Sequence, residues 1–481
     1  MKISAALIMK NEEENLPRLL KSLQGKFDEI VVVDTGSTDR SIEIAKEFGC
    51  KIYEKEWSGF ADARNYAISK CKGDLIWHFD ADFELEEKEF EKFSKLLSTI
   101  VSSDLLTYTI KVKNFNAYGM VSGISSQAFI HKNTPEVYWE GNIHEKLNQR
   151  VSLALPIFIN HYGYQDYSLN LQKLERNKKL IQQDLEIYRY KDEQEYFIKL
   201  FYMLQTLAIE SSYNFELAKQ GEHYIQEYMQ LREKCRDVDH LEFFVNYGFV
   251  YIADIYQAQK KFQKALSYLG KILDEGYDHP DIFYHKATIE EYLGQKQNAK
   301  ESYIKALIAM DKIVASVYTG VVDTLFQLYS FIEHKSTNIF EENDIERLQK
   351  RWKKERSKSL GLLLVQLYTD PLKKERLLRK IDAIFDDEWT KSFLLKHYAL
   401  QNHPARIDIA YATLEKNPYH MLANKIIGLY MYENKQYKKA WRYLKNTLIF
   451  SKDPLLLEVL IDILHHLGLP EEASRLQSLK K

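Results

Sequence analysis

The first 82 residues alternate short apolar runs with segments of helical periodicity, and this rhythm limits the possible folds more than any other feature of the sequence. Apolar runs of strand length occupy residues 3–9, 29–34, 51–53 and 74–79. The segments between them, residues 13–23, 39–48 and 61–72, have helical character, and the last two end at Gly49 and Gly73. Strands that alternate with helices predict a mostly parallel sheet with helices on both faces.

The pattern changes twice further along the chain. Longer strands with looser alternation are predicted for residues 105–115, 125–132, 137–147 and 154–161, and they suit an antiparallel edge of the sheet. Beyond about residue 168 the sequence indicates helix almost throughout. We therefore predict an α/β domain over residues 1–168, a helical connector over 169–240 and a helical-repeat domain over 241–481.

An internal repeat supports the last of these domains. Ala253 and Ala265 recur 34 residues later as Ala287 and Ala299, and Gly428, Ala440 and Ala473 continue similar spacings. A 34-residue period with small residues at helix crossings is typical of tetratricopeptide repeats, whose stacked helix pairs make concave surfaces for peptides. Residues 310–420 are predicted to be helical without a clean repeat, with loops at 335–338 and 402–404.

Composition excludes several classes of protein. The chain has 67 basic and 69 acidic residues, which argues against a nucleic-acid-binding protein. Its three cysteines form no Cys-x-x-Cys pair, so we expect neither a disulfide framework nor a structural zinc site, and a reducing cytoplasm fits. The apolar run at residues 3–9 is too short to cross a membrane, and no later run reaches 18 apolar residues, so no transmembrane segment is expected.

Polar residues follow three of the predicted strands. Asn11, Asp34, and the pair Asp80 and Asp82 come at or just after the carboxyl ends of the runs 3–9, 29–34 and 74–79. In parallel α/β sheets these ends meet at one edge, where ligands bind. Two carboxylates this close repel unless a cation lies between them, and hard divalent cations take carboxylate and phosphate oxygens. The sequence therefore predicts a cation and a diphosphate at this edge.

Five of the candidate site residues leave alternatives open. Arg64 can form a structural ion pair or contact a phosphate, and either His144 or its neighbour Glu145 can serve as a general base. His161 follows the last predicted strand, where it can be a third metal ligand, a diphosphate contact or a capping residue. Asp34 can accept a hydrogen bond from a nucleotide base, whereas the Ser and Thr residues after it are accounted for as helix caps.

Residues 1–85 resemble the family 2 glycosyltransferases of the GT-A fold. The resemblance is carried, in order, by Met-Lys-Asn11-Glu, Val-Val-Asp34-Thr-Gly-Ser-Thr-Asp, Ala-Arg64-Asn and Phe-Asp80-Ala-Asp82. The later Gly-Asn-Ile-His144-Glu145 and His161-Tyr-Gly-Tyr164, with the repeat-like tail, resemble the narrower group that includes the sublancin-type peptide S-glycosyltransferases. Together the two resemblances cover about residues 1–180.

This resemblance implies an inverting transferase that uses a UDP-sugar. Asp34 would bind the uracil or ribose, with Asn11 and Arg64 nearby, and Asp80 and Asp82 would hold Mg²⁺ or Mn²⁺. The base would be Glu145 or His144. The Glu-Asp base dipeptide and Gln-x-x-Arg-Trp motif of processive members are absent, so a polymer synthase is not expected.

The helical tail would bind a polypeptide acceptor or form a homodimer. The alternatives are transfer to a cell-envelope saccharide and a repeat scaffold whose transferase domain is inactive.

Overall fold

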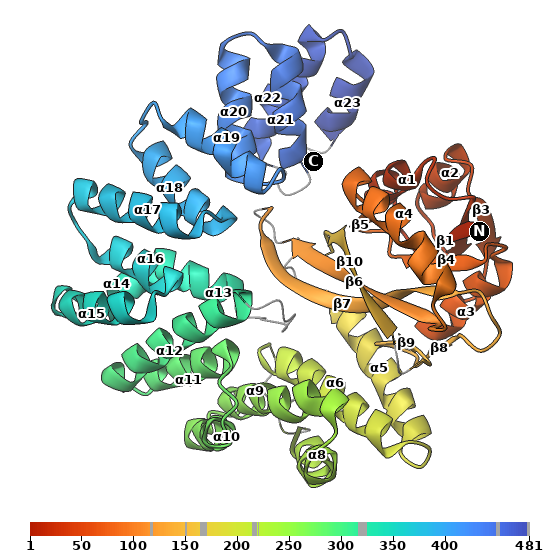
Figure 1. Ribbon diagram of the computed structural model, residues 1–481, viewed down its shortest axis with the longest axis horizontal. Helices are drawn as coiled ribbons and strands as arrows, with labels where there is room; N and C mark the ends of the chain where they lie inside the picture. The colour runs from red at the N-terminus through yellow and green to blue at the C-terminus, as the bar shows by residue number, and fades with distance from the viewer. Residues whose placement is uncertain are drawn as a thin grey trace.

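The computed structural model describes residues 1–115, 119–149, 152–163, 171–213, 219, 221–315, 325–448 and 453–478. Tyr164 of the predicted His161–Tyr164 motif lies outside these residues. The described chain comprises an N-terminal α/β domain and an all-α region that follows it (Figure 1).

The N-terminal domain is built on an eight-stranded mixed sheet. Its strand order is β3-β2-β1-β4-β7-β6-β10-β5. The strands of this sheet are β1 (Ile3–Met9), β2 (Glu29–Asp34), β3 (Lys51–Glu54), β4 (Leu75–Phe79), β5 (Phe83–Glu84), β6 (Thr107–Phe115), β7 (Val121–Lys132) and β10 (Ser152–His161). Strands β3, β2, β1 and β4 are parallel, as the alternating rhythm predicts.

Alternate residues of these parallel strands pack against helices on opposite faces. Leu7 of β1 and Trp77 of β4 belong to a core shared with α1 (Leu16–Leu23), α2 (Ser41–Glu47) and α4 (Glu87–Ser102). Ala6 and Ile76, one residue along each strand, face α3 (Phe60–Lys70) instead. The period-two alternation of a strand thus buries both faces of the sheet.

The later strands differ from expectation in two respects. Strand β7 pairs antiparallel with β4 and β6 as predicted, but β10 runs parallel to β6. The single strand predicted over residues 137–147 is wrong: it is two short strands, β8 (Trp139–Glu140) and β9 (Lys146–Leu147), that pair antiparallel. The chain reverses between them because Gly141 and His144 take positive φ angles of 93° and 49°.

The all-α region begins at α5 and α6. The following elements stack in sequence order, ending at α23. Their bounds are α5 (Leu171–Tyr188), α6 (Glu193–Ser211), α8 (Gly221–Cys235), α9 (Glu242–Ala258), α10 (Phe262–Asp274), α11 (Pro280–Tyr292), α12 (Lys296–Ala315), α13 (Leu325–Ser330), α14 (Ser336–Ile339), α15 (Ile345–Glu355), α16 (Lys358–Leu367), α17 (Pro371–Phe385), α18 (Glu388–Leu400), α19 (Arg406–Lys416), α20 (Met421–Glu433), α21 (Tyr437–Thr447), α22 (Pro454–His466) and α23 (Pro470–Ser478).

The small residues of the repeat lie where paired helices cross. Ala253, Ala265, Ala287 and Ala299 on α9 to α12 are fully buried. At Gly428 of α20 an added Cβ would lie 2.4 Å from Cγ of Leu444 on α21, so this crossing has no room for a side chain. The predicted loop at 402–404 separates α18 from α19. The loop predicted at 335–338 is wrong, because the chain there passes from a π-helical turn (Phe331–Lys335) into α14.

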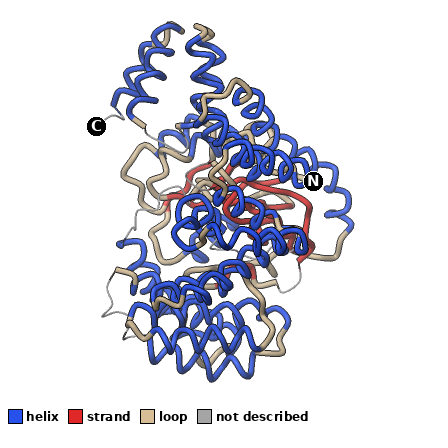
Figure 2. The backbone as a smooth tube through the Cα atoms, turned by 90° about the vertical axis from the view of Figure 1, so that its left-hand side faces the viewer, coloured by secondary structure: helices blue, strands red, loops and turns tan. Residues whose placement is uncertain are grey.

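The helices form an arc that leaves the sheet at α5 and returns to it at α20, and strands β6 and β7 project into the space inside the arc (Figure 1). Figure 2 shows the strands in the middle, with helices above and below them. Asn417, between α19 and α20, donates a 2.6 Å hydrogen bond to the carbonyl oxygen of Gly119. Tyr419 donates to Glu84 at 2.7 Å and packs on Phe115 and Tyr162. The arc is therefore fastened to the sheet domain between α19 and α20.

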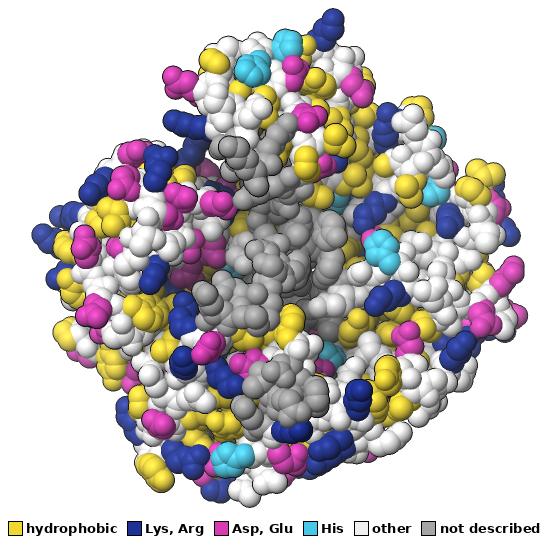
Figure 3. Space-filling view, turned by 180° about the vertical axis from the view of Figure 1, so that it is seen from behind, with side chains coloured by type: hydrophobic (Ala, Val, Ile, Leu, Met, Phe, Trp, Pro, Cys, Tyr) yellow, Lys and Arg dark blue, Asp and Glu magenta, His cyan; other side chains and the backbone are white. Residues whose placement is uncertain are grey.

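No helix among the described residues is both long and apolar enough to cross a bilayer. On the face drawn in Figure 3, basic and acidic side chains are interspersed.

Candidate active site

The carboxylates predicted to cluster do lie at one edge of the sheet. Asp34 ends β2 and is in register with Met9 of β1, whose neighbour on the other side, β4, ends at Phe79 just before Asp80. Strands two apart in a sheet are about 10 Å from one another, so Asp34 and Asp80 lie at the same edge of the sheet.

Asp34 organises the loop that follows β2. It is 3% exposed. Its Oδ2 accepts hydrogen bonds from the backbone N–H groups of Gly36 (2.9 Å) and Ser37 (3.0 Å), and Oδ1 accepts from the Ser37 hydroxyl. Asn11 holds the same loop, since its Oδ1 accepts from the N–H of Thr38 at 2.8 Å. Asp34 and Asn11, the two residues predicted to bind the donor, therefore shape the loop at this edge of the sheet.

Arg64 joins the two carboxylates on either side of it. From α3, its Nη2 donates to Oδ1 of Asp80 and its Nε donates to Oε1 of Glu145, both at 2.7 Å. The guanidinium lies over the Trp139 ring, 4.9 Å from the centroid, and its side chain is only 5% exposed. Of the two alternatives for this residue, the structure shows the ion pair. Nη1 is buried without a hydrogen-bond partner, which leaves its two N–H groups for a ligand.

His144 and Glu145 diverge in the turn between β8 and β9. The His144 ring stacks on Tyr202 of α6, with 3.7 Å between centroids and 4° between planes. The surrounding protein and the charge of Lys199 lower the pKa of His144, so it is neutral and weakly basic at pH 7 even though part of the residue is open to solvent. Glu145 turns to Arg64 instead, and only its Oε1 is hydrogen-bonded within the described chain.

A buried ion pair from the helical region holds this turn in place. Lys199 of α6 and Asp184 of α5 lie 2.9 Å apart, with side chains 3% and 1% exposed. Lys199 donates to the carbonyl oxygen of Ile143 at 2.6 Å, and Asp184 accepts from the backbone N–H and the side-chain amide of Asn142. Helices α5 and α6 thus hold the β8–β9 turn, which carries Glu145, through Asn142 and Ile143.

Asp82 and His161 form the other half of the site. His161 Nδ1 lies 2.7 Å from Oδ1 of Asn114, and its Nε2 lies 3.2 Å from Oδ2 of Asp82, with which it forms an ion pair when the ring is protonated. The other oxygen, Oδ1 of Asp82, is buried without a hydrogen-bond partner. Gly163 passes so close that a Cβ there would lie 2.3 Å from Oδ2 of Asp82.

This arrangement fits a divalent cation. A carboxylate oxygen and a neutral imidazole nitrogen are both ligands for divalent cations, and neighbouring ligands of an octahedral ion are about 3 Å apart, close to the 3.2 Å between Nε2 of His161 and Oδ2 of Asp82. No cluster of three or more His, Cys, Asp or Glu side chains suited to a metal occurs among the described residues. Asp82 and His161 would therefore hold the ion together with oxygens of its substrate, while Asp80 is engaged by Arg64.

Sequence reasoning missed Asp184, Lys199 and Asn114, which orient the predicted residues. Their signal was weak: Lys199 is a basic residue inside the apolar run of α6, where it is buried. Asn114 and His161 share an edge only because β6 and β10 pair in parallel register.

Comparison with known proteins identifies the class of the N-terminal domain. Residues 4–162 match the model of glycosyl transferase family 2. This range coincides with the sheet and contains every predicted site residue. The chain therefore carries a family 2 glycosyltransferase domain with the α/β architecture of the GT-A fold, followed by an all-α region.

Three relatives cover parts of the chain. A TPR repeat-containing protein of Synechococcus elongatus is 33% identical over 34% of this chain and 42% of its own length. An uncharacterized glycosyltransferase of Rickettsia typhi is 35% identical over 23% of this chain and 38% of its own. The SPbeta prophage-derived glycosyltransferase SunS of Bacillus subtilis is 26% identical over 38% of this chain and 45% of its own. The chain spans less than half the length of each of these relatives.

Proposed function

We propose that this protein is an inverting, metal-dependent glycosyltransferase that moves a sugar from a UDP-sugar to a side chain of a polypeptide. The observation that carries the proposal is the single edge of the sheet at which Asp34, Asp80, Asp82 and the Arg64–Glu145 pair lie. A transferase needs a donor site and a base next to each other, and this edge brings together the candidates for both.

The donor side is formed by the loop after β2 and by Asp82 with His161. Asp34 and Asn11 fix the loop against which the nucleoside would lie. Asp82 and His161 would hold Mg²⁺ or Mn²⁺, which when bound neutralises the charge of the departing diphosphate. Arg64 keeps Asp80 at this edge of the sheet and has the two N–H groups of Nη1 for a phosphate or base oxygen.

Glu145 is the better base of the two predicted. Arg64 fixes the orientation of its carboxylate, and its Oε2 makes no hydrogen bond within the described chain, so this oxygen can take the proton of an acceptor hydroxyl or thiol. As the acceptor atom bonds to the anomeric carbon, the bond from that carbon to the diphosphate oxygen breaks on the opposite side, and the configuration inverts. His144 is stacked on Tyr202 and is only weakly basic.

The polypeptide acceptor is supported by the helical region. Stacked helix pairs present concave surfaces to peptide segments, and here the arc is fastened beside the sheet edge through Tyr419 and Glu84. The similarity to SunS and to a TPR repeat-containing protein accords with this arrangement.

The decisive experiment replaces Asp82 by Asn and measures UDP binding by calorimetry with and without Mn²⁺. Wild-type protein is expected to bind UDP at least tenfold more tightly with Mn²⁺, and Asp82→Asn should lose that gain while it keeps its melting temperature. Glu43→Gln, on α2, serves as a matched control. Equal Mn²⁺ dependence in Asp82→Asn would disprove the metal role, and no UDP binding by wild-type protein would favour the inactive scaffold. Radiolabelled sugar that enters a lipid-linked saccharide and no polypeptide would favour a cell-envelope acceptor.

A further inference from the structure

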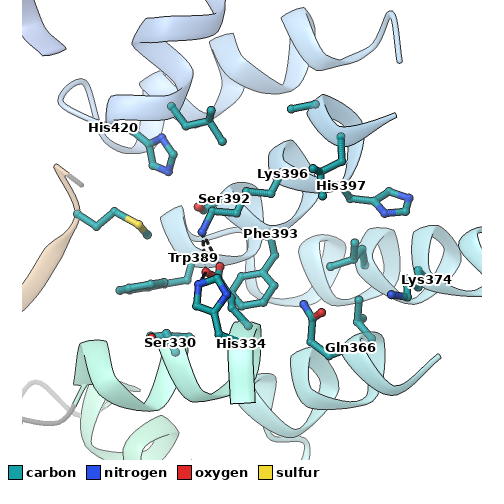
Figure 4. Close-up of a pocket in the computed structure, with 18 of the residues that line it drawn as sticks. Ser330, His334, Gln366, Lys374, Trp389, Ser392, Phe393, Lys396, His397 and His420 are labelled. Atoms are coloured by element: carbon teal, nitrogen blue, oxygen red, sulfur yellow. Dashed lines mark hydrogen bonds and ion pairs between the residues drawn. The ribbon is translucent and has the colours of Figure 1, made fainter. Parts of the chain in front are cut away.

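A cavity lies among the helices of the arc and contains none of the candidate active-site residues. Its volume is about 890 Å³, and it is lined by α13, the π-helical turn, α16, α17, α18 and the start of α20, with Met120 reaching it from beside β7 (Figure 4). A cavity of this size accommodates several residues of a peptide, since pockets for drug-sized ligands measure about 300–1,000 Å³.

The lining of this cavity is largely apolar, and its acidic and basic side chains are Glu333, Lys374 and Lys396. Trp389 stacks on Tyr329 with 3.7 Å between ring centroids, and Phe393 lies one helical turn further along α18. Lys396 donates to both carboxylate oxygens of Glu333 at 2.6 and 2.8 Å, so the acidic side chain is already paired (Figure 4). An apolar occupant matches these walls.

One polar atom in the cavity lacks a partner. His420 is 2% exposed, and its Nδ1 accepts the backbone N–H of Ala423 as the cap of α20, so in the neutral ring Nε2 carries the proton. This Nε2 is buried without a hydrogen-bond partner, and the ring points into the cavity (Figure 4). A buried N–H without a partner is unfavourable, so the site suits an occupant that brings an acceptor oxygen.

The cavity also lies close to the transferase site along the chain. Tyr419, the residue before His420, donates to Glu84, which follows Asp82 by two residues. His420, which lines the cavity, is therefore next in sequence to a contact with the sheet domain two residues from Asp82.

We propose that this cavity is a docking subsite for the polypeptide acceptor, which takes a large apolar or aromatic side chain against Trp389 and Phe393 while a backbone carbonyl of the same segment accepts a hydrogen bond from His420 Nε2. The subsite rests on the proposed polypeptide acceptor and adds to it a preference for sequence: an apolar residue at a set distance from the glycosylated side chain.

The test uses N-acetyl-phenylalanine amide as the probe, because it combines an aromatic side chain with peptide carbonyls and has no charge. Its affinity for the full chain, measured by saturation-transfer NMR titration, is expected to exceed that of N-acetyl-serine amide at least fivefold. Ala399→Trp fills the cavity and should lower the affinity at least fivefold. His420→Asn keeps a residue that can cap α20, but its shorter side chain places no donor at the position of Nε2, so it should lower the affinity about threefold. Glu415→Trp, on the exposed surface of α19, should leave the affinity unchanged.

UDP binding with Mn²⁺, measured on the same proteins, separates this inference from the proposed function. Both substitutions should leave UDP affinity within twofold of wild type. The subsite is overturned if the wild-type protein binds the two amides equally well. It is also overturned if neither Ala399→Trp nor His420→Asn lowers the affinity for the phenylalanine amide, even if UDP binds. If wild-type protein binds the amide in the cavity but not UDP, the transferase proposal fails and the subsite stands as a peptide site. Should Ala399→Trp not fold, as judged by circular dichroism, His420→Asn still decides.

Discussion

The buried pair of Asp184 and Lys199 makes the strongest quantitative prediction, because it links the helical region to the turn that carries Glu145. Replacing Lys199 by Met removes the donor to the carbonyl oxygen of Ile143 and leaves the Asp184 carboxylate without its cation. Breaking a buried ion pair by removing one partner destabilises a protein by about 3–5 kcal/mol. We expect a loss of this size for Lys199→Met and for Asp184→Asn, measured by urea unfolding.

The double variant should lose less than the sum of the two single losses, because no buried charge then remains unpaired. Turnover should also fall, since the loop would no longer hold Glu145 against Arg64, and a misplacement of about 1 Å can lower a rate by about 10²-fold. Glu145→Gln gives the reference for loss of the base itself. Lys199→Met should lower turnover by less than Glu145→Gln does, and its UDP affinity should stay near that of wild type.

The assay is the initial rate of sugar release from a UDP-sugar at saturating donor, together with calorimetry for UDP and Mn²⁺. Conditions must keep the variants folded, so rates are compared well below the urea or thermal transition. Normal turnover in a destabilised but folded Lys199→Met would refute the reasoning, because it would mean that the turn is held without the helices.

Two further predictions concern the helical region. Burial raises the pKa of Glu388, whose carboxylate accepts from Asn417, to about 7 from 4.5, so the folded state binds its proton more tightly than the unfolded state does. The free energy of unfolding should therefore fall by roughly 3 kcal/mol as pH rises from about 4.5 to 7, and then level off. Thermal melts of Glu388→Gln should lack this dependence of stability on pH. An identical pH dependence in both proteins would contradict the prediction. Gly428→Ala should cost about 1–3 kcal/mol through its clash with Leu444. Gly270→Ala, where nothing lies within 4 Å of the new methyl group, should be neutral or stabilising, and equal melting shifts for the two would count against close packing at Gly428.

Sequence alone determined the parallel strands of the N-terminal domain and the edge at which their polar residues lie. Apolar runs of strand length and glycine-terminated helical segments are local signals, so β1 and β2 are predicted to the residue and Asp34, Asp80 and Asp82 are placed at the carboxyl edge. The 34-residue spacing of small residues likewise reports helix crossings, because only small side chains let two helix backbones approach so closely.

Tertiary structure decided which partner each polar group takes. The sequence left open whether Arg64 forms an ion pair or binds a phosphate. Its hydrogen bonds to Asp80 and Glu145 arise only because α3, β4 and the β8–β9 turn converge. The divergence of His144 from Glu145, the grip of Asp184 and Lys199, and the cavity around His420 all join residues far apart in the chain. Periodicity reports the burial of a face, whereas pairing across long loops depends on strand register and helix packing, which a single sequence does not encode locally.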